Sequence, residues 1–145
     1  MNLMQCQCME KWGDAGVLLL RLALGLIFLM HGYQKVFMMG IPGVSGFLGS
    51  LGFPAATVFA YILAYGELVF GALLIVGLLT HWAAKYAAVI AIVAFATVHV
   101  SKGFFISDGG YEFIILIFAA AVSVMITGGG KYSLDAVLFK NSSHS

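Results

Sequence analysis

Long apolar runs alternate with short polar segments along this chain. Four such runs cover residues 17–37, 54–79, 82–100 and 111–127. A helix needs roughly 20 residues to cross the hydrocarbon core of a bilayer, and all four runs approach that length, the fourth being the shortest. Because an open strand in lipid would leave backbone groups without hydrogen bonds, each run is predicted to be a helix. The pattern therefore predicts an all-α fold, a polytopic membrane four-helix bundle.

Two shorter helices are predicted outside these runs. Between residues 40 and 52, apolar side chains recur at helical spacing, namely Val44, Phe47, Leu48 and Leu51. This spacing predicts a short helix in the membrane interface within the first loop. Near the end of the chain, Ser133 can cap a second short helix over residues 134–139. The expected organisation is a polar tail of residues 1–15, a four-transmembrane-helix domain of residues 16–139 and a C-terminal tail of residues 140–145.

The composition supports the membrane class. Hydrophobic residues make up 62% of the chain, charged residues only 9%, and the mean hydropathy is +1.04. A soluble domain usually has about a quarter of its residues charged, so these charges are too few to cover a soluble surface. The lipid bilayer is therefore the expected surrounding. The net charge of +1 gives no support for nucleic-acid binding.

The distribution of lysines favours one orientation in the membrane. With four spans, both termini share one side with the turn after the second span, and that side carries Lys11, Lys85, Lys131 and Lys140. The opposite side carries Lys35 and Lys102. The positive-inside rule then places both termini in the cytoplasm of a multi-pass inner-membrane protein. Cys6 and Cys8 would face a reducing compartment and are predicted to stay free, a soft-metal or redox pair being the alternative.

Ionisable side chains inside the spans are costly in lipid, so each requires a partner or a role. Arg21 in the first span and Glu67 in the second fall in the cytoplasmic half of the predicted bundle. Their predicted axial offset is roughly 5–10 Å at 1.5 Å per residue, which an arginine side chain can bridge. They are interpreted as a structural ion pair that fixes helix order and register, and a functional role is an equal alternative.

A second group of polar residues is predicted near the outer surface. It consists of His31, Lys35, His99, Tyr111 and Glu112, which come from three different spans. The group combines hydrogen-bond donors, acceptors and a side chain that titrates near neutrality. We interpret it as a site for a quinone headgroup: a histidine would donate to a carbonyl, Lys35 would stabilise the reduced oxygen and Glu112 would relay protons.

Other interpretations of these residues stay open. The five side chains could instead form an interfacial polar rim, with Lys35 snorkelling toward water. His31 and His99 lie at similar predicted depths and could ligate a haem iron, although the nearby charges of Lys35 and Glu112 disfavour it. No covalently bound cofactor is expected, and no Cys, His and Asp run has the spacing of a structural metal site.

Several ordered segments resemble the DoxX family. They are residues 20–25 (LRLALG), 31–35 (HGYQK), 50–54 (SLGFP), 77–80 (GLLT), 109–112 (GGYE) and 130–135 (GKYSLD), together with Glu67 and Gly71. The resemblance covers residues 18–138 and implies a four-helix membrane protein whose polar core comprises Arg21, Lys35, Glu67 and Glu112. The family is linked to the small subunit of a thiosulfate:quinone oxidoreductase and to membrane complexes in sulfur and oxidative-stress metabolism.

The leading functional hypothesis is a membrane redox component that binds quinone. It requires a partner oxidoreductase subunit, because the chain has no flavin, nucleotide or iron–sulfur motif. The alternative is a non-enzymatic subunit that anchors a larger membrane complex, and the sequence also leaves a homo-oligomer open. A small transporter or metal-handling protein that uses Glu67 ranks last, since four helices are few for alternating access.

Overall fold

The structure is a computed structural model that describes residues 7–139. The α-helices of this part are α1 (Gln7–Tyr33), α2 (Gly40–Ser50), α3 (Ala56–Val76), α4 (Thr80–Ala94), α5 (Glu112–Thr127) and α6 (Leu134–Leu138). Between them lie the π-helices η1 (Gln34–Met39) and η2 (Phe95–His99) and the 3₁₀-helices η3 (Val100–Lys102) and η4 (Ile106–Asp108). No strand occurs among the described residues, which confirms the all-α prediction.

The helices have the lengths and composition of a membrane protein. The helical stretches Trp12–Ser50, Ala56–Val76 and Thr80–Lys102 are long and apolar enough to cross a bilayer. α5 is apolar but has only 16 residues, a length of about 24 Å. The chain is therefore an all-α membrane protein whose helices contact lipid.

The first predicted span, residues 17–37, differs from the structure at both of its ends. Residues 7–15 of the predicted polar tail belong to α1, which begins at Gln7. The first predicted run also has no break at its end, because η1 joins α1 to α2 without a loop. Cys6 lies outside the described residues, as does the side chain of Cys8, so the prediction of free thiols stays a prediction.

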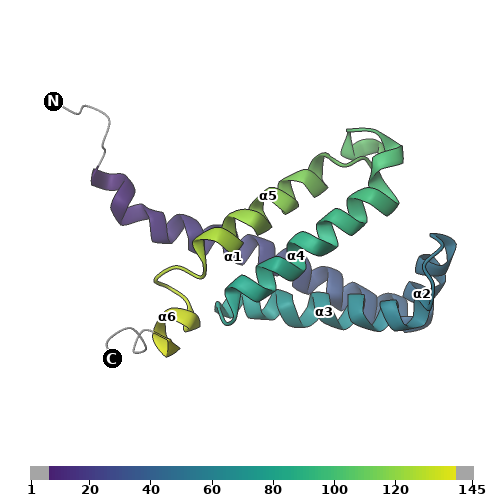
Figure 1. The fold of residues 1–145 in the computed structure, drawn as a ribbon, viewed down its shortest axis with the longest axis horizontal. Helices are drawn as coiled ribbons and strands as arrows, with labels where there is room; N and C mark the ends of the chain where they lie inside the picture. The colour runs from purple at the N-terminus through teal and green to yellow at the C-terminus, as the bar shows by residue number, and fades with distance from the viewer. Residues whose placement is uncertain (1–6, 140–145) are drawn as a thin grey trace.

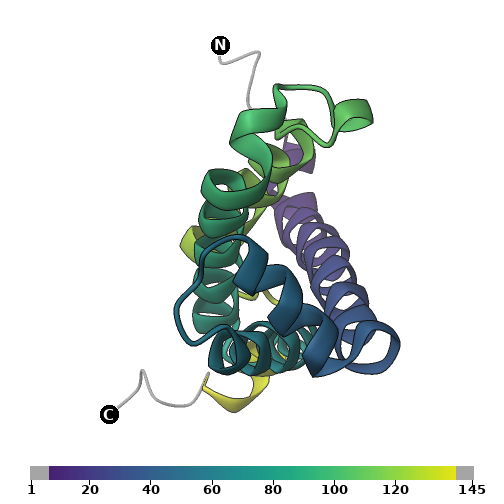
Figure 2. The ribbon, with the colours of Figure 1, turned by 90° about the vertical axis from the view of Figure 1, so that its right-hand side faces the viewer.

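The four long helices form two antiparallel pairs, α1 with α3 and α4 with α5. The pairs diverge toward one end of the molecule, and there α2 lies across the ends of α1 and α3 (Figure 1). Seen from that end, α2 is the element in front, packed on α3 (Figure 2). The predicted short helix of the first loop is thus present, and it partly closes the wide end of the bundle.

Glycines bring α1 and α3 into close contact. A Cβ on Gly25 would lie 2.9 Å from the carbonyl oxygen of Gly71, and a Cβ on Gly32 would lie 2.6 Å from the Cα of Leu68. Small residues allow membrane helices to approach in this way, since packing replaces the hydrophobic driving force that lipid does not provide. These contacts set the register of α3 along α1.

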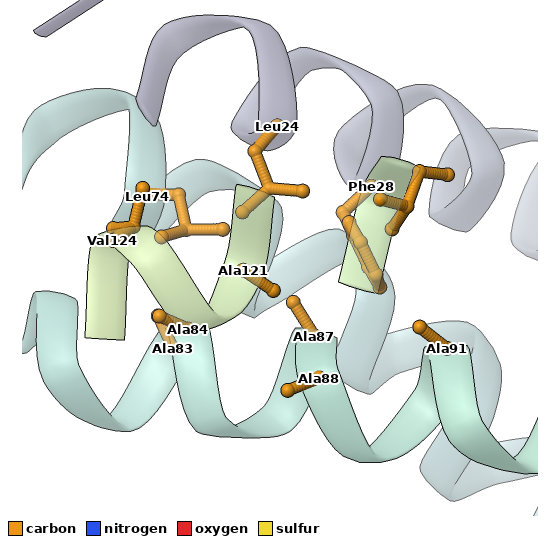
Figure 3. Close-up of a cluster of buried hydrophobic side chains, with 11 residues drawn as sticks. Leu24, Phe28, Leu74, Ala83, Ala84, Ala87, Ala88, Ala91, Ala121 and Val124 are labelled. Atoms are coloured by element: carbon orange, nitrogen blue, oxygen red, sulfur yellow. The ribbon is translucent and has the colours of Figure 1, made fainter. Parts of the chain in front are cut away.

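Alanines have the same role between α4 and α5. The buried face of α4 consists of Ala83, Ala84, Ala87, Ala88 and Ala91, and it packs against α5 and the large side chains of the other pair (Figure 3). Methyl side chains fit tightly against a neighbouring helix with little loss of conformational entropy. The central core therefore joins the two pairs at the narrow end of the bundle.

The narrow end is closed by the segment that contains α6. α3 ends at Val76, and the capping residue Gly77, with a φ of 72°, leads into a tight turn. α4 begins at Thr80, three residues after this glycine. The Asp135 carboxylate accepts hydrogen bonds from the backbone N–H groups of Leu79 (2.7 Å) and Thr80 (2.8 Å) and so caps α4. The Ser133 hydroxyl accepts from the N–H of Ala136 (3.1 Å), as predicted for the cap of α6.

Candidate functional site

A cavity of about 250 Å³ lies between the two helix pairs at the wide end of the bundle. Its walls come from α1, α3, α4 and α5, and α2 contributes Phe47 and Leu48. The polar residues of the lining are His31, Lys35, Glu67, Thr97 and His99, and every other lining residue is apolar. Ligand sites typically have this composition, with apolar walls and a few polar groups that fix orientation.

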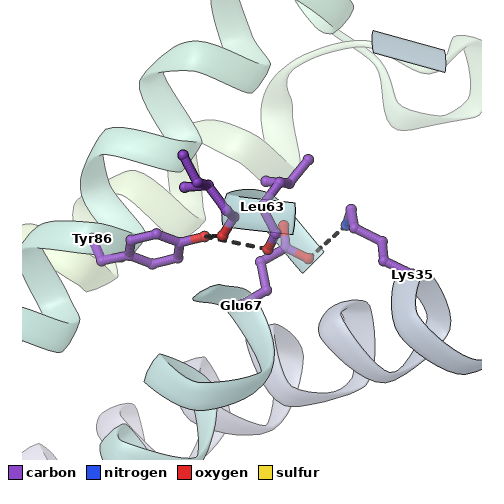
Figure 4. A network of polar contacts seen from close by, with 5 residues as sticks. Lys35, Leu63, Glu67 and Tyr86 are labelled. Atoms are coloured by element: carbon purple, nitrogen blue, oxygen red, sulfur yellow. Dashed lines mark hydrogen bonds and ion pairs between the residues drawn. The ribbon is translucent and has the colours of Figure 1, made fainter. Parts of the chain in front are cut away.

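An ion pair forms part of the lining of the cavity. Lys35 Nζ lies 2.6 Å from Glu67 Oε2, and Glu67 is only 5% exposed (Figure 4). The two residues meet because Gly32, one turn before Lys35, packs directly against the backbone of Glu67 and Leu68. Two opposite charges stabilise each other here in a setting where either alone would be costly.

Tyr86 supports α3 beside this ion pair. Its hydroxyl donates to the carbonyl oxygens of Ile62 (3.2 Å) and Leu63 (3.3 Å), one turn from Glu67 (Figure 4). Its ring occupies the space that a side chain at Gly66 would need. The position of Glu67 is therefore fixed from α4 as well as from α1.

Two side chains of the cavity lie on π-helical turns. Lys35 belongs to η1 and His99 to η2, and both segments are at the wide end of the bundle. A π-turn inserts an extra residue and so rotates the side chains that follow it relative to a continuous α-helix. Such turns are frequent at functional sites, where they aim a side chain that regular geometry would direct elsewhere.

The two histidines differ in their surroundings. His99 Nδ1 lies 2.7 Å from the carbonyl oxygen of Gly109, which can only accept, so Nδ1 carries the proton. In the neutral ring, Nε2 is then an acceptor. His31 lies one turn before Lys35 on α1 and faces the cavity with no hydrogen-bond partner among the described residues.

The predicted ion pair between Arg21 and Glu67 is wrong, because Glu67 pairs with Lys35. Arg21 lies at the other end of the bundle, where its Nη2 donates to the carbonyl oxygen of Tyr132 (2.9 Å) and its guanidinium packs against Gly77. Fourteen residues of helix, roughly 20 Å, separate Arg21 from Lys35. The register set by the glycine contacts places Arg21 opposite the end of α3 instead of opposite its middle.

Arg21 is almost completely buried, with 1% of its surface exposed. Its Nε and Nη1 atoms and the Thr80 hydroxyl have no hydrogen-bond partner among the described residues. Through its hydrogen bond to the carbonyl oxygen of Tyr132, Arg21 connects the segment before α6 to α1. Arg21 does not line the cavity.

The five-residue cluster predicted from the sequence divides into two groups. His31, Lys35 and His99 line the cavity, whereas Tyr111 and Glu112 do not. Glu112 Oε1 instead accepts a hydrogen bond from the N–H of Ile106 (2.7 Å).

The Tyr111 ring packs edge-on against Phe95 and Phe104, with centroids 5.2 and 5.7 Å away. Tyr111 and Glu112 thus stabilise the loop between η3 and α5. The carboxylate that lines the cavity is that of Glu67, not that of Glu112 as predicted. The signal that could have located Glu67 was the spacing of Gly25, Gly32 and Gly71, which fixes the register of α3 along α1.

Comparison with known proteins gives the family. The DoxX family model matches residues 16–100, more than half of the chain. The chain belongs to the DoxX family. A Bacillus subtilis protein named "Putative oxidoreductase CatD" is 35% identical over 132 residues, 91% of this chain and 93% of the relative.

Two further relatives match about half of the chain. A Haemophilus influenzae uncharacterised protein is 37% identical over 75 residues, 51% of this chain and 49% of the relative. An uncharacterised membrane protein of Mycobacterium tuberculosis is 43% identical over 72 residues, 50% of this chain and 44% of the relative. No solved structure matches the chain.

Proposed function

We propose that this DoxX protein binds the ring of a membrane quinone in the cavity at the wide end of the bundle. The observation that carries the proposal is a largely apolar cavity whose lining contains the Lys35–Glu67 ion pair, His31 and His99. A quinone ring is apolar on both faces and needs polar partners only at its two oxygens. The lining offers both kinds of contact.

The polar groups also suit the two redox forms of a quinone. Lys35 uses one of its three N–H donors on Glu67, and the others, with His31, can donate to a quinone carbonyl. Nε2 of neutral His99 can accept from the hydroxyl of the reduced form. Reduction consumes two electrons and two protons, and Glu67 and the histidines are the groups of the cavity that can exchange protons.

The electrons would come from or pass to a partner oxidoreductase subunit, since none of the side chains that line the cavity is redox-active. The name of the Bacillus subtilis relative, "Putative oxidoreductase CatD", supports a redox role but does not name a partner. By family resemblance, the metabolism concerned is that of sulfur or oxidative stress. Because of the lysine distribution, we propose that the protein lies in the inner membrane with both termini in the cytoplasm. The protein could also form a homo-oligomer instead of assembling with a different subunit.

Quinone extraction tests the proposal. The chain would be purified from membranes in mild detergent, extracted with organic solvent, and the extract analysed by mass for quinones. We expect a near-stoichiometric quinone from the unmodified protein and from Glu112→Gln, and little from Lys35→Met. The variant Lys35→Met/Glu67→Met, which leaves no lone charge, serves as the folded control and is also expected to lose quinone.

Two results would overturn the proposal: no quinone in extracts of the folded, unmodified protein, or equal retention by Lys35→Met and the unmodified chain. If Lys35→Met retains quinone but fails to assemble with other subunits, the anchoring function is the better account. A visible spectrum of the same preparation tests the haem that His31 and His99 would ligate, because bound haem absorbs strongly there.

A further inference from the structure

His31 combines properties that conflict inside a membrane. Its side chain lines the cavity, is exposed, and has no hydrogen-bond partner among the described residues. The other titratable side chains of the lining are covered more completely, since Lys35 and His99 are half-buried and Glu67 is buried. The exposed side of His31 therefore needs polar surroundings that the described residues do not supply.

The depth of His31 follows from the contact between α1 and α3. The next residue, Gly32, packs against the backbone of Leu68, which lies about 18 Å from the start of α3 at Ala56 and about 12 Å from its end at Val76. His31 is therefore level with the middle of a helix that is long enough to cross the bilayer. A histidine exposed to lipid at that depth would lose its hydrogen bonds to water, which is costly.

Other polar groups of the cavity also have unused hydrogen-bonding capacity. Lys35 uses one of its three donors on Glu67, and Nε2 of His99 is an acceptor without a partner among the described residues. Water can satisfy all of these groups, whereas a lipid chain can satisfy none of them. The cavity volume of about 250 Å³ leaves room for several water molecules, each of which takes roughly 30 Å³ in the liquid.

The cavity is closed by apolar side chains toward the narrow end of the bundle. Phe28, Ala91 and Ile117 line the cavity, are buried, and belong to the central apolar core that joins the two helix pairs. The polar lining residues lie at the wide end instead, with Lys35 on η1 and His99 on η2. Water that reaches His31 therefore comes from the wide end.

We infer that the cavity has a water-filled mouth at His31, which opens on the side of the membrane where the wide end lies. The role of the mouth in proton exchange rests on the proposed function. Reduction of a bound quinone ring takes two electrons from the partner subunit and two protons, and oxidation returns both. The protons then pass between the ring and the water of this mouth, and His31 is the first titratable group on their route.

Cysteine accessibility tests the mouth. In a background of Cys6→Ser and Cys8→Ser, which removes both cysteines of the sequence, His31→Cys is compared with Met30→Cys. Met30 is the adjacent residue on α1, is exposed and does not line the cavity, so its thiol should face lipid at nearly the same depth. Each variant would be treated with sulfonatoethyl methanethiosulfonate, a membrane-impermeant reagent that attacks thiols in water, in spheroplasts and in inverted membrane vesicles.

We expect the thiol of His31→Cys to react at least about tenfold faster than that of Met30→Cys in spheroplasts, and neither to react appreciably in inverted vesicles. Thr97→Cys, an exposed position of the lining on η2, is a second reporter with the same expected result if His31→Cys does not fold. Bound 2,3-dimethoxy-5-methyl-6-decyl-1,4-benzoquinone should slow the reaction of His31→Cys at least about fivefold, because the ring fills the cavity.

Three results would overturn the inference. Equally slow reactions of His31→Cys and Met30→Cys mean that water does not reach the cavity, and equally fast ones mean that the whole face is wet and that no mouth is confined to His31. Faster reaction of His31→Cys in inverted vesicles places the opening on the other side. Fast reaction that the quinone leaves unchanged supports the mouth but refutes the ring site, so the two proposals fail separately.

Discussion

The Lys35–Glu67 ion pair should show strong energetic coupling. With charges 2.6 Å apart and an effective dielectric constant of about 20, the Coulomb attraction is about 6 kcal/mol before the cost of desolvation is subtracted. Removing one partner from a buried pair typically costs about 3–5 kcal/mol, because the other charge is left without compensation. Glu67 is buried and the Lys35 side chain is 17% exposed, which places this pair toward the lower part of that range.

The perturbation is a double-mutant cycle of Lys35→Met, Glu67→Met and the double variant. Methionine has an unbranched side chain of similar length, so the substitutions remove charge with little change in packing. Each single variant should lose about 3 kcal/mol of unfolding free energy, more than a hundredfold in the ratio of folded to unfolded protein. The double variant should lose less than about 2 kcal/mol, because replacing both charges removes the desolvation cost together with the attraction.

The assay is reversible unfolding in mixed micelles with increasing denaturing detergent, followed by the loss of helical circular dichroism. A coupling energy of at least about 4 kcal/mol between the two sites is expected from these values. Additive effects, with coupling below about 0.5 kcal/mol, would refute the reasoning, since they would mean that solvent or lipid headgroups screen the two charges in the membrane.

Three other predictions concern the packing and the loops. Gly32→Ala should destabilise the protein by about 1–3 kcal/mol in the same assay, because the added methyl group meets the backbone of α3. The control Gly16→Ala should be neutral or stabilising, because no atom lies within 4 Å of the added methyl group. Equal effects of the two substitutions would contradict the close α1–α3 contact. Asp135→Ala should cost about 0.5–2 kcal/mol and speed amide exchange at Thr80, and unchanged exchange there would exclude the cap. Glu112→Gln should change quinone affinity less than twofold, because its carboxylate holds Ile106; a tenfold loss would return Glu112 to the ligand site.

The sequence alone determined the class of the protein and the positions of its helices. Lipid leaves few alternatives: an apolar run of sufficient length has to satisfy its own backbone hydrogen bonds, so hydropathy is enough to predict a helix. Local signals were also sufficient for the two short helices. The apolar spacing around Val44 predicted α2, and Ser133 predicted the cap of α6.

The tertiary structure alone decided which charged groups meet. Depth along a helix can be estimated from the sequence, but the register between two helices depends on contacts such as that of Gly25 with Gly71. That register pairs Glu67 with Lys35 and leaves Arg21 at the opposite end, beside Tyr132.

The sequence also did not predict how the side chains are arranged at the wide end of the bundle. The π-turns of η1 and η2 rotate Lys35 and His99 relative to regular helices, and no pattern of residues signalled them. The aromatic and hydrogen-bond contacts of the loop draw Tyr111 and Glu112 away from the cavity, although both lie close to it in predicted depth. Apolar periodicity specifies which residues avoid water, whereas the partners of the few polar residues follow from how whole helices pack.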